Sequence, residues 1–276
     1  MSTARKMAVE GEFAFTWEDF RFLAGLVRRE AGIVLPDAKA NLVYSRLSKR
    51  IRELGLESFA PYCARVEADE TERQALIAAM TTNVTRFFRE AHHFEHLERD
   101  VLPGLAAAAR EGTPIRLWSS ACSSGEEPYS IAMTLLNAMP DAGERDVKIL
   151  ATDLDPNMLA AGRAGFYPRA RLGDIPRAFH RFTEDHGAHI RIGDAARALV
   201  SFRPLNLLKA WPVKARYQVI FCRNVMIYFD QKTQDDIWRR FAQHLAPDGM
   251  IYIGHSERIG DGPYELTAQT AYRRRS

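Results

Sequence analysis

The side chains most able to do chemistry lie in the loop Ser119–Ser130, which follows the apolar run Ile115–Trp118. The pattern predicts a buried strand, a loop of small residues and the start of a helix, a junction that binds nucleotide-like ligands in open α/β sheets. A dinucleotide-binding loop has three glycines, whereas this loop has only Gly125. Glu126 and Glu127 follow it, and their charge would repel a pyrophosphate. We therefore expect a nucleoside-like ligand that is positively charged and carries no phosphate.

Asp153 stands at the end of another apolar run, Lys148–Thr152, 28 residues after Gly125. A carboxylate at this place can accept hydrogen bonds from both ribose hydroxyls of an adenosine. The competing role is a helix N-cap, but Asp155, which precedes Pro156, already suits that position. NAD-dependent enzymes use an acid in the same way, so Asp153 leaves the cofactor open. The two glutamates favour S-adenosyl-L-methionine, which has a sulfonium and an ammonium group and no phosphate.

Strands that alternate with helices are expected to position these side chains from about residue 100 onward. Buried strands are predicted at 115–118, 148–152, 200–203, 219–222 and 250–254, with helices after Gly125, Asp155 and Asp230. This alternation indicates the α/β class, with a doubly wound, Rossmann-like, mostly parallel sheet. Residues 264–266 and 269–273 are expected to close it as an antiparallel pair. Residues 165–199 do not fit one crossover helix, and His189–Asp194 alternates like a hairpin strand, so we expect an inserted small β-subdomain.

The first 80 or so residues predict a small all-helical domain. Thr16 is a suitable N-cap with Asp19 three residues later. Further helices are predicted at 39–54, 58–66 and 70–80, and the first of these has its apolar side chains on one side. Four cations gather on the adjoining side, namely Lys39, Arg46, Lys49 and Arg50. Such a face is either solvated or complementary to an acidic partner.

Composition limits the classes of function. The chain has 276 residues, a formal net charge of +3 and three cysteines. The cysteines are odd in number and far apart, which indicates a reducing cytoplasm. The mild positive charge is not a nucleic-acid signature, and no apolar run is long enough to span a membrane. The eight histidines show no metal-ligand spacing, so we expect no metal.

Four motifs resemble those of the CheR family, the bacterial chemotaxis receptor glutamate O-methyltransferases. They are Thr81–Glu90 (TTNVTRFFRE), Ser124–Ser130 (SGEEPYS), Cys222–Phe229 (CRNVMIYF) and Gly254–Glu257 (GHSE). The match runs in order from about Phe13 to Tyr272. The resemblance implies a helical N-terminal domain at 12–82 that docks on receptors, a linker or lid at 83–100, and an S-adenosylmethionine-binding domain at 101–276 with the β-subdomain at about 166–199.

The resemblance also implies site residues by motif position. The family's cofactor contacts fall on Asn83, Thr85, Arg89, Glu127, Asp153, Asn206, Leu207, Arg223 and Asn224. Glu127 is thereby selected over Glu126, which is left as a helix-start acid. Arg86 departs from the pattern by its bulk and could alter the approach of the substrate. The implied partner is the cytoplasmic helical region of methyl-accepting chemotaxis receptors, whose glutamate-rich helices would match the basic face.

The reaction implied by the resemblance transfers a methyl group from S-adenosyl-L-methionine to receptor glutamates, which gives glutamate 5-O-methyl esters and S-adenosyl-L-homocysteine. A glutamate is ionised at neutral pH, so it needs no general base, and the enzyme has to desolvate and align the reactants. We expect Arg89 and Tyr228 to line the transfer site. His92, His93 and His255 are expected to be structural.

Two other functions stay open at this stage. The first is methylation of another substrate, although Asn224–Met226 lacks the prolines that amino-methylating nucleic-acid enzymes carry after this strand. The second is a non-catalytic module that senses S-adenosylmethionine or docks on receptors. We expect a cytoplasmic monomer that does not bind nucleic acid and is not inserted in a membrane.

Overall fold

The computed structural model describes residues 6–260 and 262–275, and these form two compact units. The first unit contains the described residues up to Thr82 together with Tyr228–Thr233. The second contains Asn83–Ile227 and the described residues from Gln234 onward. No pattern in the sequence predicts that Tyr228–Thr233 packs with the first unit. The domain limits 12–82, 83–100 and 101–276 stay a prediction.

The first unit is mainly helical, as predicted. Its helices are α1 (Trp17–Ala31), α2 (Ala40–Glu53), α3 (Phe59–Ala68) and α4 (Glu70–Met80), with a 3-10 turn, η1 (Asp37–Lys39), before α2. α1 begins where the sequence predicts, because Thr16 and Asp19 form reciprocal capping hydrogen bonds. A short antiparallel ribbon of β1 (Met7–Val9) and β2 (Phe15–Thr16), which the helical pattern did not predict, precedes α1.

The core of the first unit is aromatic. Phe15 is fully buried, and its ring centroid lies 6.3 Å from that of Phe20 and 4.1 Å from that of Phe59. α2 adds Val43 and Leu47, which are also fully buried and lie on the face that the helical spacing predicts. The adjoining side of α2 therefore keeps its basic side chains out of this core.

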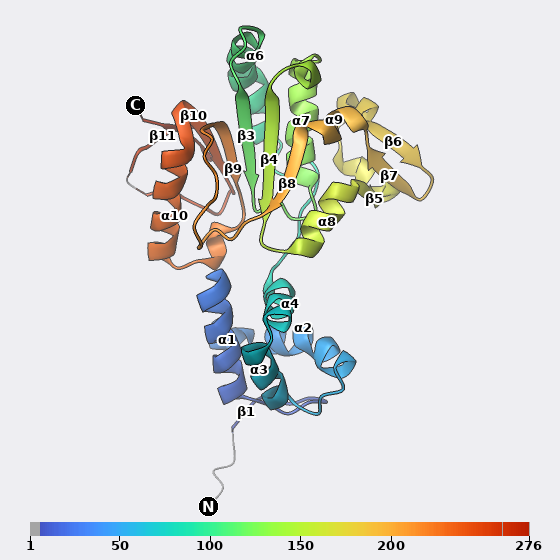
Figure 1. Ribbon diagram of the computed structural model, residues 1–276, viewed down its shortest axis with the longest axis vertical. Helices are drawn as coiled ribbons and strands as arrows, with labels where there is room; N and C mark the ends of the chain where they lie inside the picture. The colour runs from blue at the N-terminus through green and yellow to red at the C-terminus, as the bar shows by residue number, and fades with distance from the viewer. Residues whose placement is uncertain (1–5, 261, 276) are drawn as a thin grey trace, which may run out of the picture. The chain divides into compact units, whose positions relative to one another are not determined.

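Seven strands form the central sheet of the second unit (Figure 1). They lie in the order β11 (Tyr264–Ala268), β12 (Ala271–Arg274), β10 (Leu245–Ile253), β9 (Tyr217–Cys222), β3 (Ile115–Ser120), β4 (Val147–Asp153) and β8 (Val200–Pro204). The strands from β10 to β8 are parallel, whereas β12 and β11 join them antiparallel. This arrangement confirms the doubly wound sheet and its closing antiparallel pair.

Helices pack on both faces of this sheet. They are α5 (His92–His96) with a π turn, η2 (Leu97–Val101), α6 (Leu102–Arg110), α7 (Glu126–Ala138), α8 (Pro156–Ala164), α9 (Asp194–Leu199) and α10 (Gln231–His244), with 3-10 turns η3 (Ala142–Glu144) and η6 (Met226–Tyr228). Consecutive residues of β3 point to opposite faces of the sheet and show the two layers. Leu117 joins the core under α6 and α7, whereas Trp118 packs on Trp211 and on Phe241 of α10. Within the described residues, no helix is both long and apolar enough to cross a membrane.

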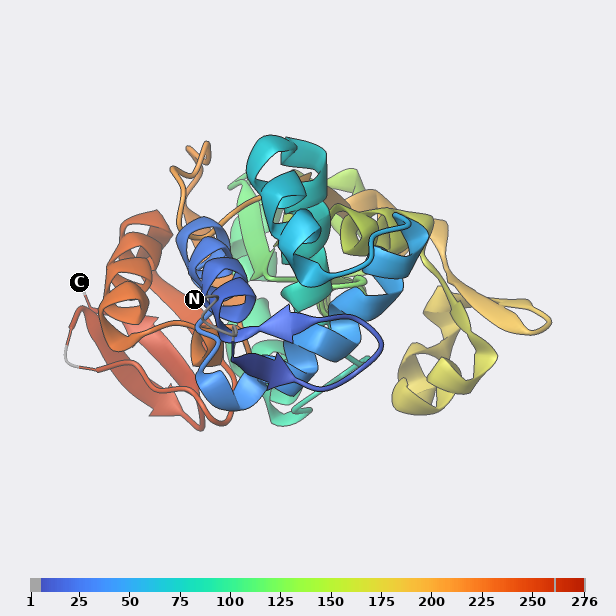
Figure 2. The ribbon, with the colours of Figure 1, turned by 90° about the horizontal axis from the view of Figure 1, so that it is seen from below.

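A second, small antiparallel sheet is inserted between α8 and α9. It has the order β5 (Phe166–Pro168), β7 (His189–Ile192) and β6 (Thr183–His186), and contains the 3-10 turns η4 (Arg169–Asp174) and η5 (Arg177–Phe182). Figures 1 and 2 show it beyond the β8 end of the large sheet, away from β11 and β12. The hydroxyl of Tyr167 donates to the carbonyl of Ser124 at 2.7 Å. The inserted β-subdomain is thus present, and it supports the loop after β3.

Candidate cofactor site

The polar loops of the second unit gather at one edge of the sheet. From β3 the chain continues into β4 on one side, whereas β9 lies on the other side of β3. β3 and β9 end side by side, with Ser120 paired to Cys222. Ligands of open α/β sheets bind at the point where the strand order reverses in this way. The topology therefore places the loops that follow Ser120, Asp153 and Cys222 at a single candidate site.

Left-handed backbone conformations gather in and near these loops. Positive φ angles occur at Phe88 (49°), Glu90 (59°), Ala121 (61°), Ser123 (49°) and Asn224 (57°), none of which is glycine. Each such residue costs roughly 1–2 kcal/mol of conformational free energy, and clusters of them are typical of functional sites. Two of these residues, Ser123 and Asn224, donate their backbone N–H groups to buried carboxylates, as the following paragraphs describe.

Asp153 is buried at the end of β4 and connects two loops. One carboxylate oxygen accepts a hydrogen bond from the backbone N–H of Ser123 at 2.7 Å, and the other accepts from that of Asp155 at 2.9 Å. Asp155 caps α8, as predicted, by accepting from the N–H of Asn157 at 2.8 Å. A carboxylate has about four acceptor positions, so Asp153 can still accept a hydroxyl proton beside its backbone partners. The geometry is compatible with a ribose contact, which stays a prediction.

Glu126 and Glu127 have different partners at the start of α7. Glu127 accepts from the Ser119 hydroxyl at 2.7 Å and from Arg223 Nη1 at 2.9 Å. Burial raises the pKa of Glu127, and the charge of Arg223 opposes this shift. Glu126 is buried and accepts from the Ser124 hydroxyl at 2.6 Å. Since only Glu127 is bonded to another predicted contact residue, it remains the stronger candidate for a cofactor contact.

Arg223 is enclosed between two acids, and its side chain is only 2% exposed. Nη1 bonds Glu127, whereas Nη2 donates to the carbonyl of Arg89 and lies 3.3 Å from Glu90 Oε2. The ring of Phe94 packs near the guanidinium, with its centroid 5.8 Å from Cζ. Because both terminal nitrogens of the guanidinium have partners, we interpret Arg223 as a residue that positions the two carboxylates, and its predicted contact with the cofactor stays a prediction.

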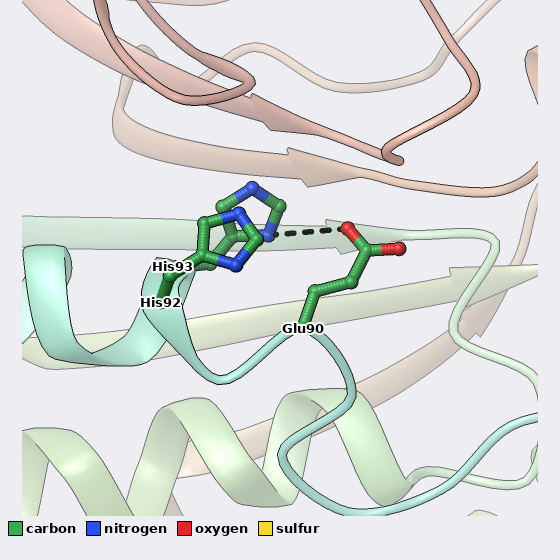
Figure 3. Close-up of side chains that lie close together, drawn as sticks. All are labelled: Glu90, His92 and His93. Carbon is green, nitrogen blue, oxygen red and sulfur yellow. Dashed lines mark ion pairs between the residues drawn. The ribbon is translucent and has the colours of Figure 1, made fainter.

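Glu90 faces a pair of histidines at the start of α5 (Figure 3). His93 Nε2 lies 2.7 Å from the hydroxyl oxygen of Thr270. On the other side of the ring, His93 Nδ1 lies 3.7 Å from Glu90 Oε2. Burial and the nearby charge of Arg223 lower the pKa of His93 to about 3, which leaves its imidazole neutral near pH 7. His93 is therefore a structural link to the β11–β12 turn, in line with its predicted role.

The same acid also meets His255, whose Nδ1 lies 3.1 Å from Glu90 Oε1. Burial opposes the ionisation of Glu90, but Arg223 and the His255 contact outweigh it and lower the pKa of Glu90 to about 2. With His92 and His93, Glu90 forms a group of potential metal-ligand atoms that lie within 4.8 Å of one another in the described part of the chain. Arg223 already supplies a positive charge to this group, and the expectation that no metal takes part stays a prediction.

Glu257 is a site residue whose role the sequence did not reveal. Its carboxylate is buried and accepts four backbone N–H groups, those of Gly254, Asn224, Val225 and Met226, at 2.6–3.0 Å. These bonds join the ends of β9 and β10 and hold Asn224 in its left-handed conformation. Burial raises the pKa of Glu257, while the four N–H groups oppose the shift. The only sequence signal was the place of Glu257 in the fourth motif.

The remaining predicted contacts fall into two groups. Asn83 lies with the Asp153 loop, because its side chain donates to Asp155 at 3.0 Å and its carbonyl accepts from the Ser123 hydroxyl at 3.0 Å. Asn206 and Leu207 follow β8, where the preceding N–H, that of Leu205, donates to the Asp153 carbonyl. These residues share the sheet edge with Asp153.

Three further predicted residues are placed less directly. Arg89 is half-buried and donates from Nη1 to the carbonyl of Val84, and Thr85 is also half-buried. Tyr228 belongs to the first unit, where its carbonyl accepts from the N–H of Val34 at 3.0 Å. Arg89 and Tyr228 thus belong to different units, and the role in methyl transfer predicted for each of them stays a prediction.

The four cations of the basic face differ in their partners. Arg46 donates from Nη1 to the last carbonyls of α4, at Ala79, Met80 and Thr81, and from Nη2 to the Thr82 hydroxyl, at distances of 2.9–3.3 Å. Arg50 forms a two-pronged pair with the buried Glu72, at 2.9 and 2.6 Å. Lys39 and Lys49 are exposed, and Lys49 has Glu53 at 3.7 Å. Two of the four predicted docking residues thus hold the first unit together.

Comparison with known proteins agrees with this arrangement. Residues 18–81 match the CheR methyltransferase all-alpha domain, and residues 83–273 match the CheR methyltransferase SAM binding domain. A probable chemotaxis protein methyltransferase of Rhizobium etli is 48% identical over 85% of this chain and 90% of its own length. Chemotaxis protein methyltransferase 2 of Pseudomonas aeruginosa is 44% identical, with 90% and 89% covered, and the chemotaxis protein methyltransferase of Escherichia coli is 44% identical, with 92% and 89% covered.

The fold, the acid-rich sheet edge and these matches define an S-adenosylmethionine-dependent methyltransferase. The residues present fit such a donor, because carboxylates at the site can accept from hydroxyl and ammonium groups. The chain belongs to the CheR methyltransferase family, whose activity is methylation in chemotaxis.

Proposed function

We propose that this protein transfers a methyl group from S-adenosyl-L-methionine to glutamate side chains of chemotaxis receptors and so forms glutamate 5-O-methyl esters. The observation that supports it most is that one chain carries both CheR parts, with the acid-rich sheet edge in one and the exposed lysines of α2 in the other. The protein would act in the cytoplasm, on the cytoplasmic helical region of the receptors.

The bound donor supplies an electrophilic methyl group on a sulfonium. Glu127, fixed by Ser119 and Arg223, would hold its ammonium group, and Asp153 would accept from its ribose hydroxyls. The other proposed contacts are Asn83, Thr85, Arg89, Asn206, Leu207 and Asn224. A receptor glutamate is ionised at neutral pH, so no side chain of this protein has to remove a proton. The work of the protein is to exclude water and to align the reacting atoms.

Arg89 and Tyr228 are proposed to line the transfer site and to orient the incoming glutamate. Loss of alignment should lower the turnover of Arg89→Ala and of Tyr228→Phe by about tenfold or more. The matched control is Arg110→Ala, since Arg110 is an exposed cation in the last turn of α6 to which the proposal gives no role. Wild-type turnover in both Arg89→Ala and Tyr228→Phe would overturn the assignment.

The basic face of α2 is proposed to dock on the acidic receptor helices, and its cations are proposed to have two different roles. Lys39 and Lys49 are exposed and are the residues that would meet the receptor. Arg46 and Arg50 would add to the positive electrostatic potential of this face, while their side chains bond to residues of α4 and hold that helix in place. Charge reversal at Lys39 and Lys49 is therefore a cleaner test of docking than charge reversal at Arg46 and Arg50.

Two alternative functions are a methyltransferase for another substrate and a non-catalytic module that senses S-adenosylmethionine or docks on receptors. One experiment separates all three, namely transfer of a labelled methyl group to receptor-containing membranes, followed by base treatment and capture of labelled methanol. A glutamate methyl ester is base-labile and releases methanol. Binding of the donor without labelling of receptors would favour one of the alternatives.

A further inference from the structure

The connection from β8 to β9 starts with two of the predicted cofactor contacts, Asn206 and Leu207. It comprises residues 205–216, all of which the structure describes, and it contains neither helix nor strand. β8 lies at one edge of the sheet, and β4 and β3 separate it from β9, so the connection has to cross two strands. Irregular connections of this length in compact domains are usually functional or poorly ordered. The conformation of Asn206 and Leu207 therefore depends on the contacts that hold this connection.

Arg240 of α10 holds the start of the connection through two carbonyl groups. Its Nη1 donates to the carbonyl of Leu207 at 2.7 Å, and its Nη2 donates to that of Lys209 at 2.5 Å. Arg240 Cζ lies 4.0 Å from the ring centroid of Trp211, whose Nε1 donates to the same Leu207 carbonyl at 3.2 Å. Trp211 packs in turn on Trp118 of β3, with the ring centroids 5.2 Å apart. The two carbonyls are thus tied to α10 and to the sheet.

The effect of Arg240 reaches Asn206 through a single peptide group. The Leu207–Leu208 peptide is planar, and its oxygen and its N–H point in opposite directions. The oxygen faces Arg240, whereas the N–H of Leu208 donates to Asn206 Oδ1 at 2.9 Å. Rotation of this peptide would break the bonds on both sides. Arg240 therefore orients the side-chain amide of Asn206 through the backbone.

The order of the strands indicates which part of the donor meets this turn. The proposed contacts for the ammonium group and the ribose are Glu127, which follows β3, and Asp153, at the end of β4. β8 is the next strand beyond β4, and the N–H of Leu205 donates to the Asp153 carbonyl at 3.0 Å. The base and the amino-acid part are attached at opposite ends of the ribose. The adenine is therefore expected beyond β4, next to Asn206 and Leu207.

We propose that Arg240 is a positioning residue for the adenine of S-adenosylmethionine. It holds the turn Asn206–Lys209 in the conformation that presents Asn206 and Leu207 to the base. This inference rests on the proposed function, which gives those two residues a role at the cofactor, and it adds the residue that acts through them. Loss of Arg240 should weaken recognition of the base more than recognition of the rest of the ligand. A merely structural role would weaken all ligands by the same factor.

The test is calorimetric titration of the full chain with S-adenosylhomocysteine and S-inosylhomocysteine, which differ only in the base. A site ordered for adenine leaves polar groups mismatched with hypoxanthine, so the wild type should bind the adenosyl ligand at least about tenfold more tightly. Arg240→Met keeps an unbranched side chain against Trp211 but loses both donors. In this variant we expect the Kd of S-adenosylhomocysteine to rise about tenfold and that of S-inosylhomocysteine less than about twofold.

Three further variants sharpen the test. Arg239→Met makes the same change at the preceding position, where an exposed arginine pairs with Asp236, and should change neither Kd. Arg240→Lys keeps the charge, but a single ammonium group cannot bridge both carbonyls as the guanidinium does, so it should recover only part of the preference for adenine. Trp211→Phe keeps an aromatic ring and removes the second donor to Leu207, which should reduce the preference about twofold. It replaces Arg240→Met if that variant does not fold.

Urea unfolding curves would show which variants are folded. Equal binding of both ligands by the wild type would overturn the inference. An unchanged ratio of the two Kd values in folded Arg240→Met, or in Trp211→Phe, would also overturn it. Failure of the wild type to label receptors, together with the expected Kd ratios, would count against the proposed function alone.

Discussion

Arg50 and Arg223 are both paired with buried glutamates, yet they form different kinds of cluster. Arg50 forms two short bonds with one buried acid, Glu72, and its second acidic neighbour, Glu53, is half exposed and 3.6 Å away. Arg223 is itself buried and shares its guanidinium between two acids with little exposure, Glu90 and Glu127. The first arrangement needs no further partner and stabilises the helical unit. The second includes Glu127, the acid proposed to meet the cofactor, so a buried ion pair is linked to the proposed function here and to stability there.

The largest effect is expected where the Arg223 cluster would meet the ligand. Glu127→Gln removes the carboxylate proposed to hold the donor ammonium group, and we expect the Kd of S-adenosylmethionine to rise roughly thirtyfold in calorimetric titration. Glu126→Gln is the matched control, because Glu126 bonds Ser124 instead of Arg223. If both variants bound the donor equally well, the distinction between the two glutamates would be lost.

A slightly smaller effect is expected on folding when Arg46 is changed. Arg46→Ala leaves the last carbonyls of α4 without their charged donor, which should lower the free energy of unfolding by about 1.5–2 kcal/mol. Urea denaturation followed by circular dichroism would measure it. A normal unfolding curve for Arg46→Ala would show that the arginine is free to dock, as the sequence alone suggested.

Glu72→Gln tests the balanced pair and its dependence on pH. The hydrogen bonds from Arg50 lower the pKa of Glu72 in the folded state. The resulting stability is therefore present above the ordinary glutamate pKa of about 4.5 and is lost as the pH falls through the folded-state value. We expect Glu72→Gln to cost about 1–2 kcal/mol at pH 7 and to flatten the decline of stability as the pH falls below the ordinary glutamate pKa.

Donor affinity should stay unchanged in this variant, because Glu72 belongs to the first unit. Denaturation curves at several pH values and one titration with S-adenosylmethionine would check both statements. An unaltered pH profile would contradict the role of this pair.

The smallest structural effect is expected at the exposed lysines. Lys39→Glu and Lys49→Glu should change the free energy of unfolding by less than about 0.5 kcal/mol each, since neither side chain is buried. Combined, they should still reduce receptor methylation several-fold at low ionic strength, with a smaller effect in high salt. Receptor methylation that is insensitive to both substitutions would remove the docking role from α2.

Local patterns in the sequence predicted most of the fold. The capping box at Thr16 and Asp19 and the N-cap at Asp155 depend on residues two or three positions apart, so the sequence shows them directly. The strands of the parallel sheet were predicted because burial on both faces gives continuous apolar runs. β1 and β2 were missed because they are three and two residues long, too short for a periodic signal.

The charge clusters could not be predicted, because their members are far apart in the chain. Arg223 and Glu90 are separated by 133 positions, and nothing in the sequence around either residue indicates that the two form an ion pair. The sequence predicted Arg46 on the side of α2 that adjoins its apolar side, but the bonds of Arg46 to the end of α4 depend on how the two helices pack. Glu257 shows the same limit, since a glutamate after a strand gives no sign that four N–H groups will converge on it.

The position of Glu257 has a consequence for motion. Asn224 and Val225 form a loop and Met226 begins the 3-10 turn η6, and amides in such segments ordinarily exchange with solvent deuterium within seconds to minutes. Here their N–H groups point at a carboxylate that is 4% exposed, so exchange requires an opening that separates them from a buried charge. The loop after β9 should therefore exchange as slowly as the strands on either side of it, and the edge of the sheet that faces the ligand behaves as part of the rigid core.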